Sequence, residues 1–245
     1  MDSHRSHRLS LAGLCMTAAL GLLALVTPAA QAAPPEWMVN GFNVSSNLPV
    51  VLSPEIEQIS FEETQKRVLV LLGETAGVPL WFTCEEVTPE NIVLMASGTG
   101  SGEARFAHCK TLTRSGGVVT LNSNCTPKEP IVAAFNFSIA LHGTPTKAYV
   151  KMTGANAGGR FATITISNEL CAFEGSYEVK GTFWIEDCTN QFEAELLTHL
   201  IKEGAIPASK LGGLTLGGNP ATLDGSVNLQ LFDLTLMQKF SGLAS

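Results

Sequence analysis

The chain has 245 residues and a formal net charge of −7 at pH 7, and hydrophobic residues make up 45% of it. This acidic balance argues against nucleic acid or an anionic membrane as partner, because both attract positively charged surfaces. The apolar content excludes an intrinsically disordered chain. We therefore expect a folded protein with a core of its own.

The N-terminus carries the three parts of a secretory signal peptide. Arg5 and Arg8 form a positive start, residues 9–26 are almost wholly apolar, and residues 30–32 (Ala-Gln-Ala) form a small-x-small cleavage sequence. This order predicts a leader over residues 1–32 that is removed on export. An uncleaved anchor is the alternative, because the apolar run is long enough to span a bilayer. We expect a secreted protein, whether periplasmic, cell-surface or extracellular, with no stable membrane span after cleavage.

Residues 33–66 are predicted to form an extended N-terminal arm, because turn residues punctuate them throughout. Residues 50–52 fit a short strand. Residues 56–67 are polar and Glu-rich, with Glu62 and Lys66 four positions apart, and this spacing suits a brief helix.

From residue 67 onward, apolar runs of strand length alternate with Gly, Pro and Asn turns. In the clearest runs apolar and polar residues alternate with period two, which is the side-chain period of a half-buried strand. The expected strands are 68–72, 78–84, 92–95, 118–121, 135–141, 148–152, 161–166, 171–188, 192–201 and 223–230. This rhythm predicts a single all-β domain over residues 67–245, an antiparallel sandwich or barrel with disulfides.

Two of these runs have alternatives. Residues 171–188 fit either one strand or two strands joined near Gly181. Residues 192–201 match a helical stripe as well as a strand, and the alternating run that follows them favours the strand.

Five cysteines follow the predicted leader, and in an exported protein they should pair. The odd number leaves one unpaired, and five choices of that cysteine with three pairings of the other four give 15 possible frameworks, so the sequence does not fix the connectivity. Cys109 with Cys125 is the favoured local pair, since a turn at Gly116-Gly117 would fold them together. Cys84 with Cys171 would then form the second disulfide, leaving Cys188.

With the predicted leader, Cys125-Thr126-Pro127 and the Gly225-Ser226 strand, the chain resembles exported bacterial β-rich proteins with paired cysteines. The likeness covers about residues 80–235 in general organisation. It implies a secreted β domain, and it implies no activity and no functional residue.

Motifs for catalysis are missing from the chain. The Gly-rich residues 97–103 lack the Lys and helix of a phosphate loop, so we expect a hairpin turn there. Neither His-Glu-x-x-His nor paired Cys-x-x-Cys occurs, so we expect no metal and no cofactor. His108 adjoins Cys109, but neighbours on a strand point to opposite faces and would not form a thiolate pair. We expect no catalytic residue and no enzyme.

These observations favour an exported structural or interaction protein whose partner is a protein or a glycan. Trp184 falls on the polar parity of its strand, so an exposed indole there would provide a stacking surface. A carbohydrate- or small-ligand-binding module is therefore the alternative, although a covered second face would bury Trp184. A hydrolase using His142, at a predicted strand end, is the third hypothesis.

Overall fold

The structure is a computed structural model that describes residues 35–39, 42–44, 51–55, 59–62, 65–67, 69–141, 148–188, 197–201, 213–233, 236–238 and 240–243. Every regular element in these residues is a β-strand, which confirms the predicted all-β class. Residues 34–245 form one compact unit. The predicted leader over residues 1–32 lies outside the described residues.

The strands follow one another along the chain with turns between them. Their bounds are β1 Glu36–Val39, β2 Phe42–Asn43, β3 Val51–Glu55, β4 Ile59–Glu62, β5 Gln65–Arg67, β6 Leu69–Thr75, β7 Val78–Met95, β8 Thr99–Ser115, β9 Val118–Leu121, β10 Ile131–Leu141, β11 Ala148–Gly154, β12 Arg160–Ile166, β13 Gly175–Cys188, β14 Leu197–Ile201, β15 Leu214–Leu216, β16 Asn219–Asp233, β17 Leu236–Gln238 and β18 Phe240–Leu243.

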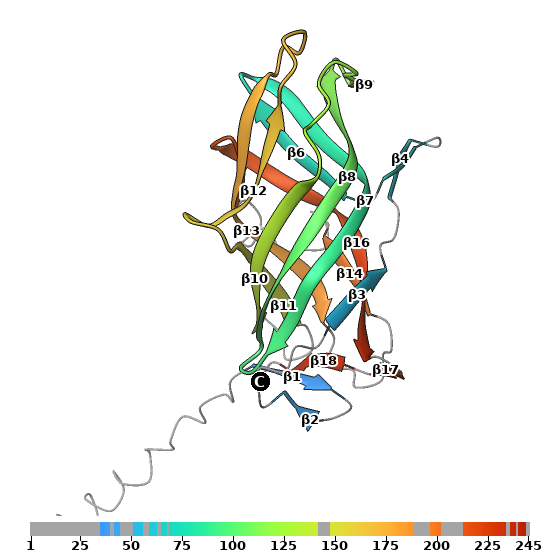
Figure 1. Cartoon of the computed structure of the whole chain (residues 1–245), viewed down its shortest axis with the longest axis vertical. Coiled ribbons are helices and arrows are strands. Elements are labelled where there is room, and N and C mark those ends of the chain that lie inside the picture. Colours follow the sequence, from blue (N-terminus) through green and yellow to red (C-terminus); the bar gives the residue numbers. More distant parts are fainter. Residues whose placement is uncertain are drawn as a thin grey trace, which may run out of the picture. The chain divides into compact units, whose positions relative to one another are not determined.

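The wall of the molecule is an antiparallel barrel of 8 strands. Its order is β6-β7-β8-β10-β11-β13-β14-β16, and β16 pairs back onto β6 through Leu223 opposite Leu71. The wall strands follow one another in chain order, with the short strands β9, β12 and β15 interposed outside the wall order, so the barrel is an up-and-down meander. Figure 1 shows the long strands β7, β8 and β10 side by side and tilted in the same sense. Of the two predicted architectures, the barrel is therefore the one observed.

Side chains from opposite walls meet inside the barrel. Phe82 on β7 and Tyr177 on β13 belong to strands that are not neighbours, yet their ring centroids are 6.2 Å apart. Gly100 on β8 faces Phe137 of β10 so closely that an added Cβ would overlap the ring. An eight-stranded barrel is just wide enough for its side chains to fill. Around Phe82, Tyr177 and Phe137, the interior of the barrel is therefore a packed core.

A small sheet of β18, β1 and β2 holds an aromatic anchor against one end of the wall. Trp37 on β1 is 3% exposed, packs edge-on against Phe137 at 5.9 Å between centroids, and donates its indole N–H to the carbonyl of Thr99 at 2.8 Å. The N-terminal segment is thus an integrated part of the core at this point.

Three short strands, β9, β12 and β15, pair with parts of the long wall strands β8 and β13. β12 and β15 both pair with the first half of β13, and β9 pairs with the last part of β8. β13 changes neighbours near Gly181, whose φ is 108° and whose Cβ would collide with the carbonyl of Gly213. The predicted run 171–188 is therefore one strand over 175–188 with a bend at Gly181.

Several predicted strands are confirmed, and three local expectations are wrong. Residues 78–84 and 92–95 belong to a single strand, β7, which contains a register irregularity between Glu90 and Val93. Only residues 96–98 form the predicted Gly-rich turn, and the rest of that run begins β8. The described parts of 56–67 form the β4–β5 hairpin in place of a helix. Within 192–201, the described part is strand β14, as favoured.

Candidate interaction surface

The four cysteines predicted to pair form two disulfides, but the predicted pairing is wrong. Cys84 bonds Cys109, and Cys125 bonds Cys171. Cys84 and Cys109 lie directly opposite each other on β7 and β8, with Cα atoms 3.9 Å apart. The hairpin turn at Gly116-Gly117 does form, yet β9 ends at Leu121 before Cys125 comes level with Cys109. The assignment of Cys188 as the unpaired cysteine concerns a side chain outside the described ones.

The second disulfide joins the segment after β9 to the turn before β13. Cys125 is fully buried, and neighbouring bonds hold the same segment in place. The Glu129 carboxylate accepts the backbone N–H of Cys109, and the Lys128 N–H donates to the carbonyl of Thr165 at 2.7 Å. Residues 122–130 therefore bridge β8 and β12 where no strand pairing joins these two strands.

Beside the first disulfide, the wall carries charged groups that pair with one another. Glu85 and Glu86 are both exposed; Glu85 forms an ion pair with Lys110 of β8, and the Glu86 carboxylate lies 3.5 Å from Nε2 of His108. Cys109 is buried in its disulfide while His108 is exposed with φ 52°, so these neighbours do not act together. The adjacent acids Glu85 and Glu86 thus contact side chains of the neighbouring strand on the protein surface.

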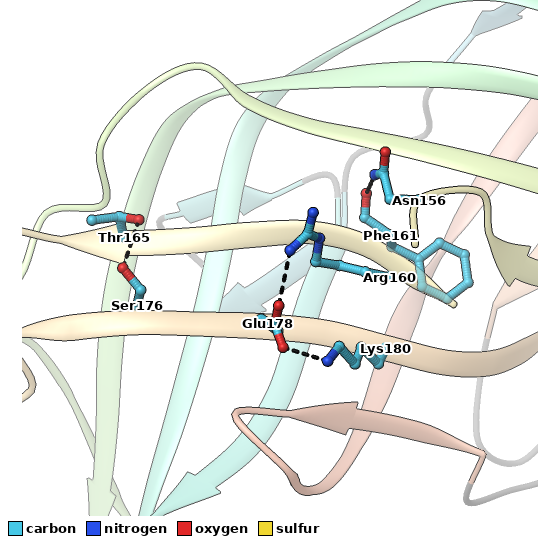
Figure 2. A network of polar contacts seen from close by, with 7 residues as sticks. All are labelled: Asn156, Arg160, Phe161, Thr165, Ser176, Glu178 and Lys180. Atoms are coloured by element: carbon cyan, nitrogen blue, oxygen red, sulfur yellow. Dashed lines mark hydrogen bonds and ion pairs between the residues drawn. The ribbon is translucent and has the colours of Figure 1, made fainter. Parts of the chain in front are cut away.

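A second polar network covers the outer face of β12 and β13. Figure 2 shows the Glu178 carboxylate between Arg160 and Lys180, and the Arg160 Nη1 to Glu178 Oε1 distance is 2.9 Å. These two cations hold the pKa of Glu178 below its usual value, with the hydrogen bond from Lys180 as the larger cause. The Thr165 and Ser176 hydroxyls bond each other at 3.1 Å on the same face. The charges of this face are mutually satisfied.

Trp184, the predicted stacking residue, lies on β13 opposite Lys151 of β11. Its side chain is half-buried. The other two tryptophans differ from it, because Trp37 is buried in the core and Trp81 lies on the outside of β7 beneath the guanidinium of Arg114.

In the part of the chain that the structure describes, the β8–β9 hairpin leaves one edge of the sheet without a partner strand. A two-residue turn joins its strands at Gly116 and Gly117, whose φ values of 58° and 86° suit a type I′ turn. Asn122 continues the ladder by donating its N–H to the carbonyl of Thr111 at 2.9 Å. Among the described strands β9 pairs with β8 alone.

The hydrogen-bond alternation shows which groups face the open side. In an antiparallel pair, hydrogen-bonded residue pairs alternate with non-bonded ones. Since Asn122 bonds toward β8, Thr120 and Val118 do as well, and Val119 and Leu121 direct their N–H and C=O groups outward. No described backbone group accepts or donates to these outward groups. We call Val118–Leu121 with these outward groups the β9 edge.

Apolar side chains lie on β9 and on the strands beside it. One cross-strand row on the outer face runs from β6 to β9 through directly opposed residues: Leu72, Trp81, Leu112 and Leu121. Leu121, at the end of this row, is 46% exposed, and Val118 beside the turn is 66% exposed. Arg114 spans the row, with its guanidinium carbon 5.8 Å from the Trp81 ring centroid. The row thus ends in a leucine that is accessible at the open edge.

The β9 edge also lacks charge. Residues 116–127 contain no Asp, Glu, Lys or Arg in a chain with a net charge of −7. Natural edge strands are commonly protected by a charge, by proline or by a covering segment. The expectations from the sequence did not include this edge, although its uncharged run and its Gly116-Gly117 turn are both visible there and could have identified it.

The remaining candidate residues do not assemble into a site within the described part of the chain. Among these residues no group of three or more His, Cys, Asp or Glu side chains is placed to hold a metal ion. His142, the base of the hydrolase hypothesis, lies outside the described residues.

Comparisons with known proteins leave the chain without a family assignment, since no family model, curated protein or solved structure matches it. In the described residues, no helix has the length and apolar character that crossing a membrane requires.

Proposed function

We propose that this protein is an exported, non-catalytic interaction protein that binds a protein partner through the β9 edge. The observation that carries the proposal is the outward row of backbone groups on Val119 and Leu121, on a strand without charge. Addition of an extended strand to an open sheet edge is a common mode of protein recognition, in which main-chain hydrogen bonds supply the affinity.

Two further features support this proposal. The two disulfides fit an oxidising compartment outside the cytoplasm. The core side chains that meet inside the barrel, such as Phe82 and Tyr177, favour recognition on the outside of the wall.

Site-specific photo-crosslinking tests the proposal in cells that produce the protein. A photoreactive phenylalanine would replace Thr120 on β9, and the matched control would replace Thr163, which is likewise exposed on β12. We expect a discrete protein adduct from position 120 and none from position 163. Equal labelling at the two positions, or no adduct at either, would argue against the β9 edge as a recognition site.

The second candidate function is carbohydrate or small-ligand binding at Trp184. In its favour, Trp184 and Lys151 lie on the outer parity of neighbouring strands, and an indole beside a polar side chain suits sugar stacking. A panel of glycans would be titrated against tryptophan fluorescence in the wild type and in Trp184→Phe. Quenching that disappears in the variant supports this function, whereas unchanged fluorescence with every glycan counts against it.

A further inference from the structure

We infer that the partner of the β9 edge is a second copy of this chain, joined by antiparallel β9–β9 pairing about a two-fold axis. This inference rests on the proposed function, because it names the occupant of the same edge. It follows from three properties of β9: the direction of its free backbone groups, the parity of its side chains, and its lack of charge.

The first property is hydrogen-bond self-complementarity. The N–H and C=O groups that have no partner among the described backbone groups belong to Val119 and Leu121, two positions apart on the same strand. An antiparallel copy can therefore place Val119 opposite the second copy's Leu121, and Leu121 opposite its Val119. Each such pair exchanges both of its backbone bonds. One register thus satisfies every free group of the β9 edge in both copies.

The second property concerns the faces of the joined sheet. A two-fold axis perpendicular to the sheet keeps the outer face of each copy on the same side, so only residues of equal parity can be opposed. The register meets this condition, because the side chains of Val119 and Leu121 both lie on the outer face of the sheet. It places apolar side chains opposite each other and extends the row that contains Trp81 and Leu112 across the junction. Thr120 meets its own symmetry mate on the axis, and opposed threonines are a favourable cross-strand pair.

The third property is charge. Two copies of a chain with a net charge of −7 repel each other, and the repulsion is weakest where their facing surfaces are neutral. Residues 116–127 form such a neutral run. In the proposed register the two Arg114 side chains lie on β8 of each copy, with both β9 strands between them. Like charges are therefore not brought into contact.

The sharpest variant is Val119→Pro. Proline lacks the backbone N–H and is tolerated on an edge strand where that N–H faces solvent. In this hairpin the Val119 N–H points away from β8, so the change removes two intermolecular hydrogen bonds per dimer and leaves the β8–β9 ladder intact. We expect dimer dissociation to become about 10-fold to 100-fold easier. Analytical ultracentrifugation across a concentration series measures this dissociation constant.

A charge substitution supplies an independent variant with a matched control. Leu121→Lys places two lysines in the proposed interface and should make the protein monomeric. Val132 on β10 is also an exposed apolar residue, at 37%, so Val132→Lys makes the same chemical change elsewhere on the wall and should leave the dimer intact. Equal dissociation in both lysine variants would contradict the inference.

A cysteine at the axis tests the register itself. Thr120→Cys, in a Cys188→Ser background, should form an intermolecular disulfide on mild oxidation, because opposed residues of a non-bonded pair approach to about 4.5 Å between Cα atoms. Thr163→Cys in the same background should stay monomeric on a non-reducing gel. A dimer without this crosslink would overturn the β9–β9 register.

The outcomes separate the inference from the function on which it rests. If the purified wild type is monomeric at every concentration tested, pairing with a second copy is wrong. A photo-adduct from position 120 that contains a different protein would then still support the β9 edge as a recognition site. If neither a dimer nor an adduct from position 120 is detected, both the proposed function and this inference are wrong.

Discussion

Tyr177 ties the start of β13 to the turn that precedes it. Its ring is buried against Phe82, and its hydroxyl donates to the carbonyl of Phe173 at 2.8 Å. This turn also contains Cys171, which is bonded to Cys125. A single side chain therefore links the core, the turn and the region of the second disulfide.

We predict that Tyr177→Phe lowers the free energy of unfolding by about 1 kcal/mol at pH 7, because it removes one hydrogen bond and keeps the ring. Urea unfolding of the two proteins measures the difference. Val179→Ala, at the next buried position of β13, is a comparison in which core volume is lost instead. A variant as stable as the wild type would show that the bond to Phe173 contributes nothing.

The same residue predicts a pH dependence. Burial raises the pKa of Tyr177 above its ordinary value of 10.0, because the phenolate would lose solvation. The unfolded chain then loses its proton first as the pH rises. The contribution of protonated Tyr177 to the free energy of unfolding is fully present below pH 10. It is lost as the pH rises through the higher pKa of Tyr177 in the folded protein. In Tyr177→Phe this alkaline loss should be smaller, as measured by urea unfolding between pH 9 and about 11.5.

At the scale of elements, β8 depends on glycines that the turn chemistry of the sequence does not explain. Gly100 and Gly102 lie within the strand, opposite Phe137 and Phe135 of β10. At Gly100 an added Cβ would overlap the ring of Phe137 and would also approach the carbonyl of Val93. The glycines make room for two aromatic rings inside a narrow barrel.

We predict that Gly100→Ala destabilises the fold by about 1–3 kcal/mol, the usual cost of overpacking a core. Gly158→Asn is the matched control, since no heavy atom lies within 4 Å of the position that a Cβ would take there and Asn tolerates a φ of 73°. Thermal unfolding of the two variants should separate them. Similar melting temperatures would mean that Phe137 moves aside without cost.

The elements also show what the sequence could and could not predict. A local pattern predicts the strands from 118–121 to 161–166: period-two alternation at 135–141, and strand-length runs between Gly, Pro and Asn turns elsewhere. It could not join 78–84 to 92–95, because Asn91, with φ 52°, carries the chain through an irregularity inside β7. The Gly-rich run 97–103 predicts a turn from sequence alone, because the side chain that requires Gly100, Phe137, lies on another strand.

The candidate surface was less predictable than the strands for a related reason. Alternation shows which side chains share a face, but it does not show which strand lacks a neighbour. The position of β9 at an edge depends on residues 122–130 leaving the sheet and on Cys125 reaching Cys171. The predicted Cys109–Cys125 disulfide is wrong for the same reason, since alternation does not show which strands are neighbours. Cys84 on β7 lies directly opposite Cys109.

At the scale of the whole molecule, the disulfides close loops of different length. Cys84–Cys109 spans 25 residues and Cys125–Cys171 spans 46. From the entropy of the unfolded chain, their removal should cost about 3.5 and about 4 kcal/mol, respectively. We predict that Cys125→Ala with Cys171→Ala is at least as destabilising as Cys84→Ala with Cys109→Ala, as measured by urea unfolding.

Hydrogen exchange would distinguish a second effect of these two pairs of substitutions. Loss of Cys125–Cys171 should increase exchange at Lys128, whose N–H bonds Thr165, because the bridging segment loses its covalent anchor. Loss of Cys84–Cys109 should affect that amide less, since the β7–β8 ladder continues on both sides of the bond. The opposite pattern would contradict the bridging role of residues 122–130.

The closure of β16 onto β6 has a consequence for the order of folding. These are the last and first strands of the wall, so the closing ladder joins the segments that are farthest apart along it. Pairing of such distant segments is slow, because the chain between them must be ordered first. A chain that emerges N-terminus first must therefore hold β6 through β14 as an open sheet until β16 arrives. The barrel closes only when its last wall strand, β16, pairs with both β14 and β6.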